Sequence, residues 1–219
     1  MKMSTNKWLA LLIWCIMLCF LYSTAWAEVR LLEPKQDLGS VKITNNNNLH
    51  SFHISEDMAY VAGGYDDKLS LVDLSDMQNP QITDELDLNS DVYGVQVNDD
   101  YAYVANYGYG LKVFDISDPY NATQVGSIDP GCAFRSRLAI SNDGKYIYAG
   151  DTCARFFILD VQNASNPNKL SHKNMNAEIQ AIDVDADSAY VATQDGLQIL
   201  DISNSSDPQI ITNGTLSFG

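Results

Sequence analysis

Basic residues are scarce in this 219-residue chain, because 13 lysines and arginines stand against 28 aspartates and glutamates, for a formal charge of −15. An acidic protein is repelled by nucleic-acid phosphates and by anionic membrane surfaces, so we expect neither nucleic acid nor a membrane surface as its main partner. Helical periodicity is also lacking, since residues 28–219 never repeat apolar side chains every 3.6 positions. The 46% hydrophobic content excludes a disordered or fibrous chain and suffices for a sizeable core.

Motifs for the common chemistries are missing as well. The sequence has no Ser–His–Asp order, no phosphate-binding loop and no HExxH. His50 and His53 are three residues apart, and in a strand that spacing sends the two rings to opposite faces. The acidic run from Asp183 begins like a calcium loop but lacks the later glycine and glutamate that such a loop needs. We therefore predict no cofactor and no metal site.

Residues 1–27 have the features of an export signal. A short positively charged start precedes an apolar run at residues 8–22, and Ala25-Trp26-Ala27 supplies the small-x-small pattern that signal peptidase accepts. The run is shorter than the roughly 20 apolar residues of a membrane span, with an uncleaved anchor as the alternative. We expect cleavage before Glu28 to leave a protein without a membrane span in the periplasm, at the cell surface or outside the cell.

The rest of the chain is a repeat. Four similar segments begin at Ala59, Ala102, Tyr146 and Ala189. Their starts are 43 or 44 residues apart, and a period of roughly 40–50 residues is typical of the four-stranded blades of β-propellers.

Each repeat unit reads as four short strands separated by turn residues. An Ala/Tyr/Val strand is followed by a Leu-x-aliphatic-apolar-Asp strand, a turn rich in Asp, Ser, Asn and Pro, a more polar strand and an alternating strand. We predict that residues 28–219 form an all-β, β-propeller-like array of four four-stranded blades, approximately residues 48–88, 91–129, 135–175 and 178–217.

The strand that ends in aspartate is apolar on both faces, most clearly at residues 156–159, Phe-Phe-Ile-Leu. A sheet face that is turned to water would not tolerate such a strand. A blade between two neighbouring blades requires it, because burial stabilises by about 25 cal/mol per Å² of apolar area. The more polar strand fits an outer edge.

The stretch GLKVFDISDP at residues 110–119 resembles the LVIVD repeat of exported bacterial and archaeal proteins. GLQILDIS at residues 196–203 and LSLVDLSD at residues 69–76 carry the same pattern, whereas FFILDVQN at residues 156–163 departs from it most. The resemblance covers essentially all of residues 28–219. It implies propeller blades and a surface or periplasmic location, and it implies no particular reaction.

An aspartate recurs at the end of one strand in every unit, at Asp73, Asp115, Asp160 and Asp201. Four carboxylates in register invite a metal-binding or catalytic interpretation. We favour a structural one, since a catalytic group is needed once and a turn is needed in every blade. An aspartate at such a position accepts backbone N–H groups in a tight turn. We predict four turn residues and no catalytic residue.

The third unit breaks the repeat with two cysteines. Cys132 enters its first strand, and Cys153 lies between its second and third strands. Strand directions alternate in a blade, so both loops emerge on one face. We predict a disulfide there, which chain-entropy estimates value at on the order of 3 kcal/mol, with two free thiols as the alternative.

Three of the four arginines of the chain fall in the same two loops, at Arg135, Arg137 and Arg155. Guanidinium groups hold carboxylates or phosphates with paired hydrogen bonds. We hypothesise a binding site for an acidic ligand or protein on this face, helped by the aromatic residues Phe134, Tyr65 and Tyr107. The alternative is that the arginines pair with neighbouring acids, namely Asp129 and Asp151.

Four blades do not decide whether the propeller ring is closed. Strand-like pieces at residues 37–44 and 209–217 flank the four units, so the ring is closed, an open arc, or half of a larger propeller. We favour an incomplete ring whose exposed end blades associate with a partner, two copies forming an eight-blade ring being one such assembly.

Two classes of function fit these observations. We favour an exported, non-enzymatic scaffold that binds a protein or an acidic ligand. The alternatives are a metal-dependent propeller hydrolase of the lactonase type and a truncated propeller fragment. A hydrolase needs non-repeated ligands in the central channel, and the candidates there do not make a metal set: His53, Gln96 and Asp183.

Overall fold

The computed structural model describes residues 40–43, 49–63, 67–135 and 138–214. These residues form four antiparallel sheets, each with four strands in chain order. Each repeat unit therefore folds into one blade, and the predicted fold class is confirmed. Among the described residues there is no helix of the length and hydropathy that a membrane crossing requires. The expected export signal lies outside the described residues.

Each blade has strands of five to seven residues, except that the first strand of blade 3 has only two. Blade 1 contains β1 (Ser51–Ser55), β2 (Met58–Gly63), β3 (Lys68–Asp73) and β4 (Gln81–Asp87). Blade 2 contains β5 (Val92–Asn98), β6 (Tyr101–Asn106), β7 (Gly110–Asp115) and β8 (Thr123–Ile128). Blade 3 contains β9 (Ala139–Ile140), β10 (Tyr146–Gly150), β11 (Arg155–Asp160) and β12 (Asn168–Asn174). Blade 4 contains β13 (Ile179–Asp185), β14 (Ser188–Thr193), β15 (Gly196–Asp201) and β16 (Gln209–Gly214).

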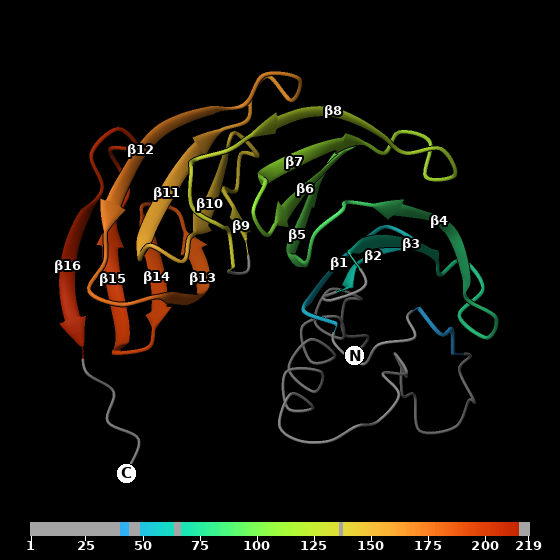
Figure 1. The fold of residues 1–219 in the computed structure, drawn as a ribbon, viewed down its shortest axis with the longest axis horizontal. Coiled ribbons are helices and arrows are strands. Elements are labelled where there is room, and N and C mark those ends of the chain that lie inside the picture. The colour runs from blue at the N-terminus through green and yellow to red at the C-terminus, as the bar shows by residue number, and fades with distance from the viewer. Residues whose placement is uncertain (1–39, 44–48, 64–66, 136–137, 215–219) are drawn as a thin grey trace, which may run out of the picture.

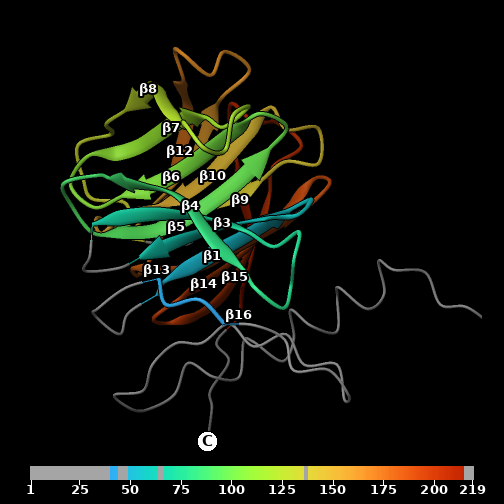
Figure 2. The ribbon, with the colours of Figure 1, turned by 90° about the vertical axis from the view of Figure 1, so that its right-hand side faces the viewer.

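The blades stand side by side in an open arc (Figure 1). The first strand of each blade lines the inside of the arc, and the fourth strand lies on the outside, as its polar sequence predicts. Seen from the side in Figure 2, blade 1 lies in front of the other blades. The ring is not closed between blades 1 and 4.

The two strand-like pieces that flank the repeat have different outcomes. Of the second piece, residues 209–214 are described, and they form β16, the outer strand of blade 4. Of residues 37–44, only residues 40–43 are described, and they form no strand. Val41 and Ile43 instead pack against blade 1.

Every blade has two apolar faces, because successive side chains of a strand point to opposite sides. We call the face toward the next blade in the chain the forward face and the other the back face. Tyr60, Tyr103 and Tyr148 occupy the same position on the forward faces of blades 1, 2 and 3, and they are only 4%, 2% and 3% exposed. Each forward face packs on the back face of the following blade. Phe156, Phe157, Ile158 and Leu159 are 0% exposed, as a strand buried on both faces requires.

The outer strands of blades 1, 2 and 3 also reach the following blade. A register shift interrupts all four outer strands at the same place. Near it, the Thr83 hydroxyl donates to the carbonyl oxygen of Pro119 at 3.0 Å, and the Ser171 hydroxyl donates to that of Ser205 at 2.6 Å. The two accepting residues hold the same position in the turn before the outer strand of the next blade.

Between blades 2 and 3 the approach is closer still. A Cβ atom added to Gly126 would lie 2.1 Å from the carbonyl oxygen of Ala164. Ala164 holds the turn position that Pro119 and Ser205 hold in the other blades, so the glycine allows the two backbones to meet.

We predict that Gly126→Ala lowers the free energy of unfolding by about 2 kcal/mol, because the methyl group forces blades 2 and 3 apart. Chemical denaturation followed by circular dichroism measures the change. Gly63→Ala is the matched control, since its added Cβ meets only the carbonyl oxygen of Lys68 at 3.2 Å. Equal stability of the two variants would contradict the packing of β8 on the turn of blade 3.

The repeated aspartates lie in the turns that follow the third strands. Asp73, Asp115, Asp160 and Asp201 each accept a hydrogen bond from the backbone N–H two residues later, at 2.7 to 3.0 Å. The hydroxyl groups of Ser117 and Ser203 add second bonds to the same oxygens at 2.7 and 2.6 Å. The local turn thus takes up one oxygen of each carboxylate.

These turns, together with the turn between β9 and β10 that holds Asp143, should make the protein sensitive to acid. Hydrogen bonds from the following serine hold the pKa of Asp73, Asp115 and Asp201 below the usual 3.8, and Lys145 and Ser141 lower the pKa of Asp143 to about 2. In this range the folded state binds fewer protons than the unfolded state, so stability is fully present above pH 4 and falls as pH approaches about 2. Melting temperatures from pH 7 to pH 2 test this, and an unchanged value between pH 4 and pH 2 would contradict it.

Candidate functional site

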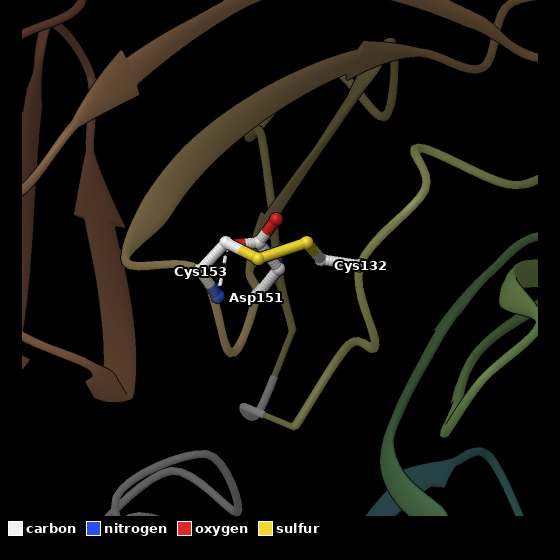
Figure 3. Close-up of side chains that lie close together, drawn as sticks. All are labelled: Cys132, Asp151 and Cys153. Atoms are coloured by element: carbon white, nitrogen blue, oxygen red, sulfur yellow. Dashed lines mark hydrogen bonds between the residues drawn. A yellow bond between two sulfur atoms is a disulfide. The ribbon is translucent and has the colours of Figure 1, made fainter.

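A disulfide joins Cys132 in the loop before β9 to Cys153 in the loop between β10 and β11 (Figure 3). The two Cα atoms are 6.2 Å apart. The disulfide ties together two loops of the same blade that emerge on one face of the arc.

The carboxylate of Asp151 lies beside this disulfide and organises the same loop (Figure 3). Its Oδ1 accepts the backbone N–H groups of Cys153 at 3.0 Å and of Arg155 at 2.8 Å, and its Oδ2 accepts Nε of Arg155 at 2.7 Å. Within the described part of the chain, Asp151 and the two cysteines are the only cluster of three potential metal ligands. The two sulfurs are bonded to each other, and both oxygens of the carboxylate accept hydrogen bonds, so the cluster does not suit a metal ion.

Arg155 and Phe134 make their contacts within blade 3. Besides Asp151, the Arg155 guanidinium contacts the carbonyl oxygen of Pro130 at 3.4 Å and lies 5.0 Å from the centre of the Phe157 ring. Phe134 is 0% exposed, and its ring packs 5.6 Å from that of Phe157. The hypothesis expected both side chains to contact a ligand. In the structure, Arg155 forms an ion pair with Asp151 and Phe134 packs in the core. Arg137 and Tyr65 lie outside the described residues.

Arg135 has a different environment, because half of its side chain, 51%, is exposed. Its guanidinium lies 5.8 Å from the centre of the Tyr93 ring, and its Nη1 is 3.6 Å from Oε1 of Glu178. Hydrogen bonding to Tyr93 and the charge of Glu178 raise the pKa of Arg135, so it stays cationic.

Aromatic rings continue the site toward blade 1. The Tyr93 ring meets the His50 ring edge-on at 4.3 Å between centroids and lies 5.8 Å from the Tyr107 ring. Tyr107 is 40% exposed. We call this group the rim cluster: His50, Tyr93, Tyr107, Arg135 and Glu178.

All four repeat units contribute to the rim cluster. His50 directly precedes β1, Tyr93 is the second residue of β5, and Tyr107 begins the loop between β6 and β7. Arg135 lies in the loop that leads to β9, and Glu178 directly precedes β13. Side chains at or near the starts of the inner strands, with Tyr107 from a neighbouring loop, therefore come together from all four units on one face of the arc.

Four successive matches to the LVIVD repeat model cover residues 50–86, 90–129, 136–173 and 178–214. The chain belongs to the LVIVD-repeat family. No curated protein sequence matches it.

Several solved structures share the fold of this LVIVD-repeat chain. The Pseudomonas aeruginosa periplasmic gluconolactonase PpgL superposes with a TM-score of 0.69 at 13% identity, covering 84% of this chain and 61% of the lactonase. The computationally designed Ika4 protein gives 0.60 at 15% identity, covering 76% and 98%. The Myceliophteria thermophila Cps50 (Swd1) β-propeller domain gives 0.59 at 18% identity, covering 75% and 55%. The chain thus spans just over half of two of these, and at such identities the likeness shows the fold alone.

The channel candidates of the LVIVD-repeat chain do not assemble a metal site. His53 Nδ1 and Gln96 Oε1 form a hydrogen bond of 3.0 Å, and Gln96 Nε2 donates to the carbonyl oxygen of Leu138 at 2.9 Å. These bonds link the inner strands of blades 1 and 2 with the segment that leads into blade 3. Burial lowers the pKa of His53, so its ring is neutral at pH 7. Asp183 accepts the backbone N–H of Val184.

Sequence reasoning found Arg135 and Tyr107 but missed Tyr93, Glu178 and the part that His50 plays. The signal was present, since His50, Tyr93, Arg135 and Glu178 follow one another at intervals of about one repeat. Residues that stand at the same place in successive blades meet at the end of the channel. An alignment of the units by strand start would have brought these four together.

We predict that Arg155→Ala lowers the free energy of unfolding by about 3 kcal/mol, because it strips the 0% exposed Asp151 side chain of its cationic partner. Urea denaturation measures the loss. Lys68→Ala is the control, since it breaks a pair with Glu85 in which the side chains are 39% and 34% exposed, and it should change stability little. A stable Arg155→Ala variant would mean that the side chain is free for another role.

Proposed function

We propose that this LVIVD-repeat protein is an exported, non-enzymatic scaffold that uses the rim cluster to bind a carboxylate-bearing segment of a partner protein. The observation that carries the proposal is the half-exposed Arg135 guanidinium at a point where all four repeat units meet. Support for export comes from the expected signal at residues 1–27, the disulfide and membership of the family.

Charge supports an acidic group as the ligand. The whole chain carries a formal charge of −15, and against this background Arg135 presents a half-exposed cation. The distance of 3.6 Å between Arg135 and Glu178 is longer than a hydrogen bond. An incoming carboxylate can therefore take over the guanidinium, because exposed ion pairs of this kind contribute little free energy.

The aromatic rings support a protein segment over a small anion. Tyr107 offers a 40% exposed ring close to the cation, with the Tyr93 ring beneath the guanidinium. Tyrosine and arginine are enriched in protein interfaces, where they combine a large contact area with directed hydrogen bonds. A partner that carries Asp or Glu next to an apolar residue would use both features.

We predict that Arg135→Ala weakens binding of an acidic peptide at least tenfold, while Arg135→Lys retains part of the affinity. The probe is a peptide with one tryptophan and several glutamates, and its fluorescence anisotropy is followed. Residues 28–219 contain no tryptophan, so the signal comes from the peptide alone.

Two controls separate site binding from charge effects. Lys145→Ala removes one positive charge from the turn between β9 and β10, away from the rim cluster, and should leave the affinity unchanged. A peptide with glutamine in place of glutamate should not bind. Equal affinity of the unaltered protein and Arg135→Ala, or equal binding of both peptides, would overturn the proposal.

A further inference from the structure

In the part of the chain that the structure describes, no blade covers the forward face of blade 4 as one covers the other three forward faces. Tyr190 holds the position of Tyr60, Tyr103 and Tyr148, since each lies opposite the same residue of the third strand. Those three side chains are 4%, 2% and 3% exposed, whereas Tyr190 is 38% exposed. The difference arises because blade 4 is the last blade of the arc. Blade 3 packs on its back face, and no described blade covers its forward face.

The neighbours of Tyr190 repeat this contrast. Leu197 and Ile199 of β15 are only partly buried. Their counterparts in blade 1, Leu69 and Leu71, are 0% exposed because blade 2 covers them. The forward face of blade 4 is therefore built like an inner interface of the propeller and is left uncovered.

The outer strand of blade 4 and the turn of blade 1 carry the two halves of a further contact. Ile211 holds the position of Val125, which packs against the core between blades 2 and 3, and it is 58% exposed. Met77 holds the turn position of Ala164, which packs against that same core from blade 3, and it is 53% exposed. In the described residues these two side chains therefore stand at opposite ends of the arc, each without the contact that its counterpart has.

Of the described residues, only a short segment covers the back face of blade 1. Ala59, Val61 and Val72 form this face, and they pack against Ile43, with Val41 and Leu49 at the edge. In blades 2, 3 and 4 the same face meets a whole blade. Residues 41–43 thus occupy the place that a preceding blade would take.

We propose that two copies of this chain assemble head to tail, with the forward face of blade 4 of each copy seated on the back face of blade 1 of the other. The incoming blade displaces Ile43 and covers Tyr190, and the outer strand at Ile211 then lies against the turn at Met77. A second copy is the occupant because the new interface continues one that the chain already forms three times. Such a head-to-tail contact closes a ring of two chains and eight blades, which leaves no exposed end.

The mass of the purified full-length protein in solution tests this assembly. Sedimentation at 0.15 M salt, where like charges on the two copies are screened, should show the mass of two chains. Tyr190→Asp should raise the dissociation constant of the dimer at least tenfold. Ile211→Asp should do the same at a site too exposed to affect folding, and Tyr109→Asp, at an equally exposed residue away from the end blades, should not.

Two further variants test the direction of the contact. Met77→Asp should also weaken the dimer, and an equal mixture of Tyr190→Asp and Met77→Asp copies should regain association, because one interface between them is intact. Ile43→Ala should strengthen the dimer by weakening the competing cover. A monomer at every concentration, or a dimer that Tyr190→Asp and Met77→Asp leave unchanged, would overturn the proposal. A dimer that only Tyr190→Asp weakens would show a symmetric contact between two copies of blade 4 and would overturn it as well.

Discussion

Stacking of blades face to face is the constraint on which the rest of the structure depends. The third strand of an inner blade is apolar on both sides, and Phe156, Phe157, Ile158 and Leu159 lose all contact with water. No single sheet can bury both of its faces, so each blade needs a neighbour on each side. The described residues satisfy this need inside the arc and only in part on the outer faces of blades 1 and 4.

The same stacking places the polar chemistry of the molecule. Because equivalent strands of the blades lie in register, the starts of the inner strands meet on one face of the arc. His50, Tyr93 and Glu178 come together with Arg135 there. The turns before the outer strands lie on the opposite face of the arc, and there their aspartates accept hydrogen bonds from backbone N–H groups. The repeat thus gives the fold its turns, and the departures from the repeat give it a distinctive surface.

The sequence predicted the strands, the four blades and the incomplete ring, because their signals are periodic and local. It was less informative about single side chains in the irregular third unit. Arg135 and Arg155 look alike in the sequence, yet one is half exposed and the other pairs with the buried Asp151. Phe134 lies two residues after Cys132 in a loop, yet its backbone bridges to Asp151 and its ring packs in the core against Phe157. Such outcomes depend on contacts between segments that no local pattern encodes.

The central claim is that blades 1 to 3 each have a covered forward face and that blade 4 does not. Hydroxyl-radical footprinting of the dilute protein, read by mass spectrometry, compares the equivalent tyrosines directly. The account predicts modification of Tyr190 with protection of Tyr60, Tyr103 and Tyr148. Equal protection of all four at the lowest concentration would mean that the ring closes within one chain, and equal modification would mean that the blades do not stack.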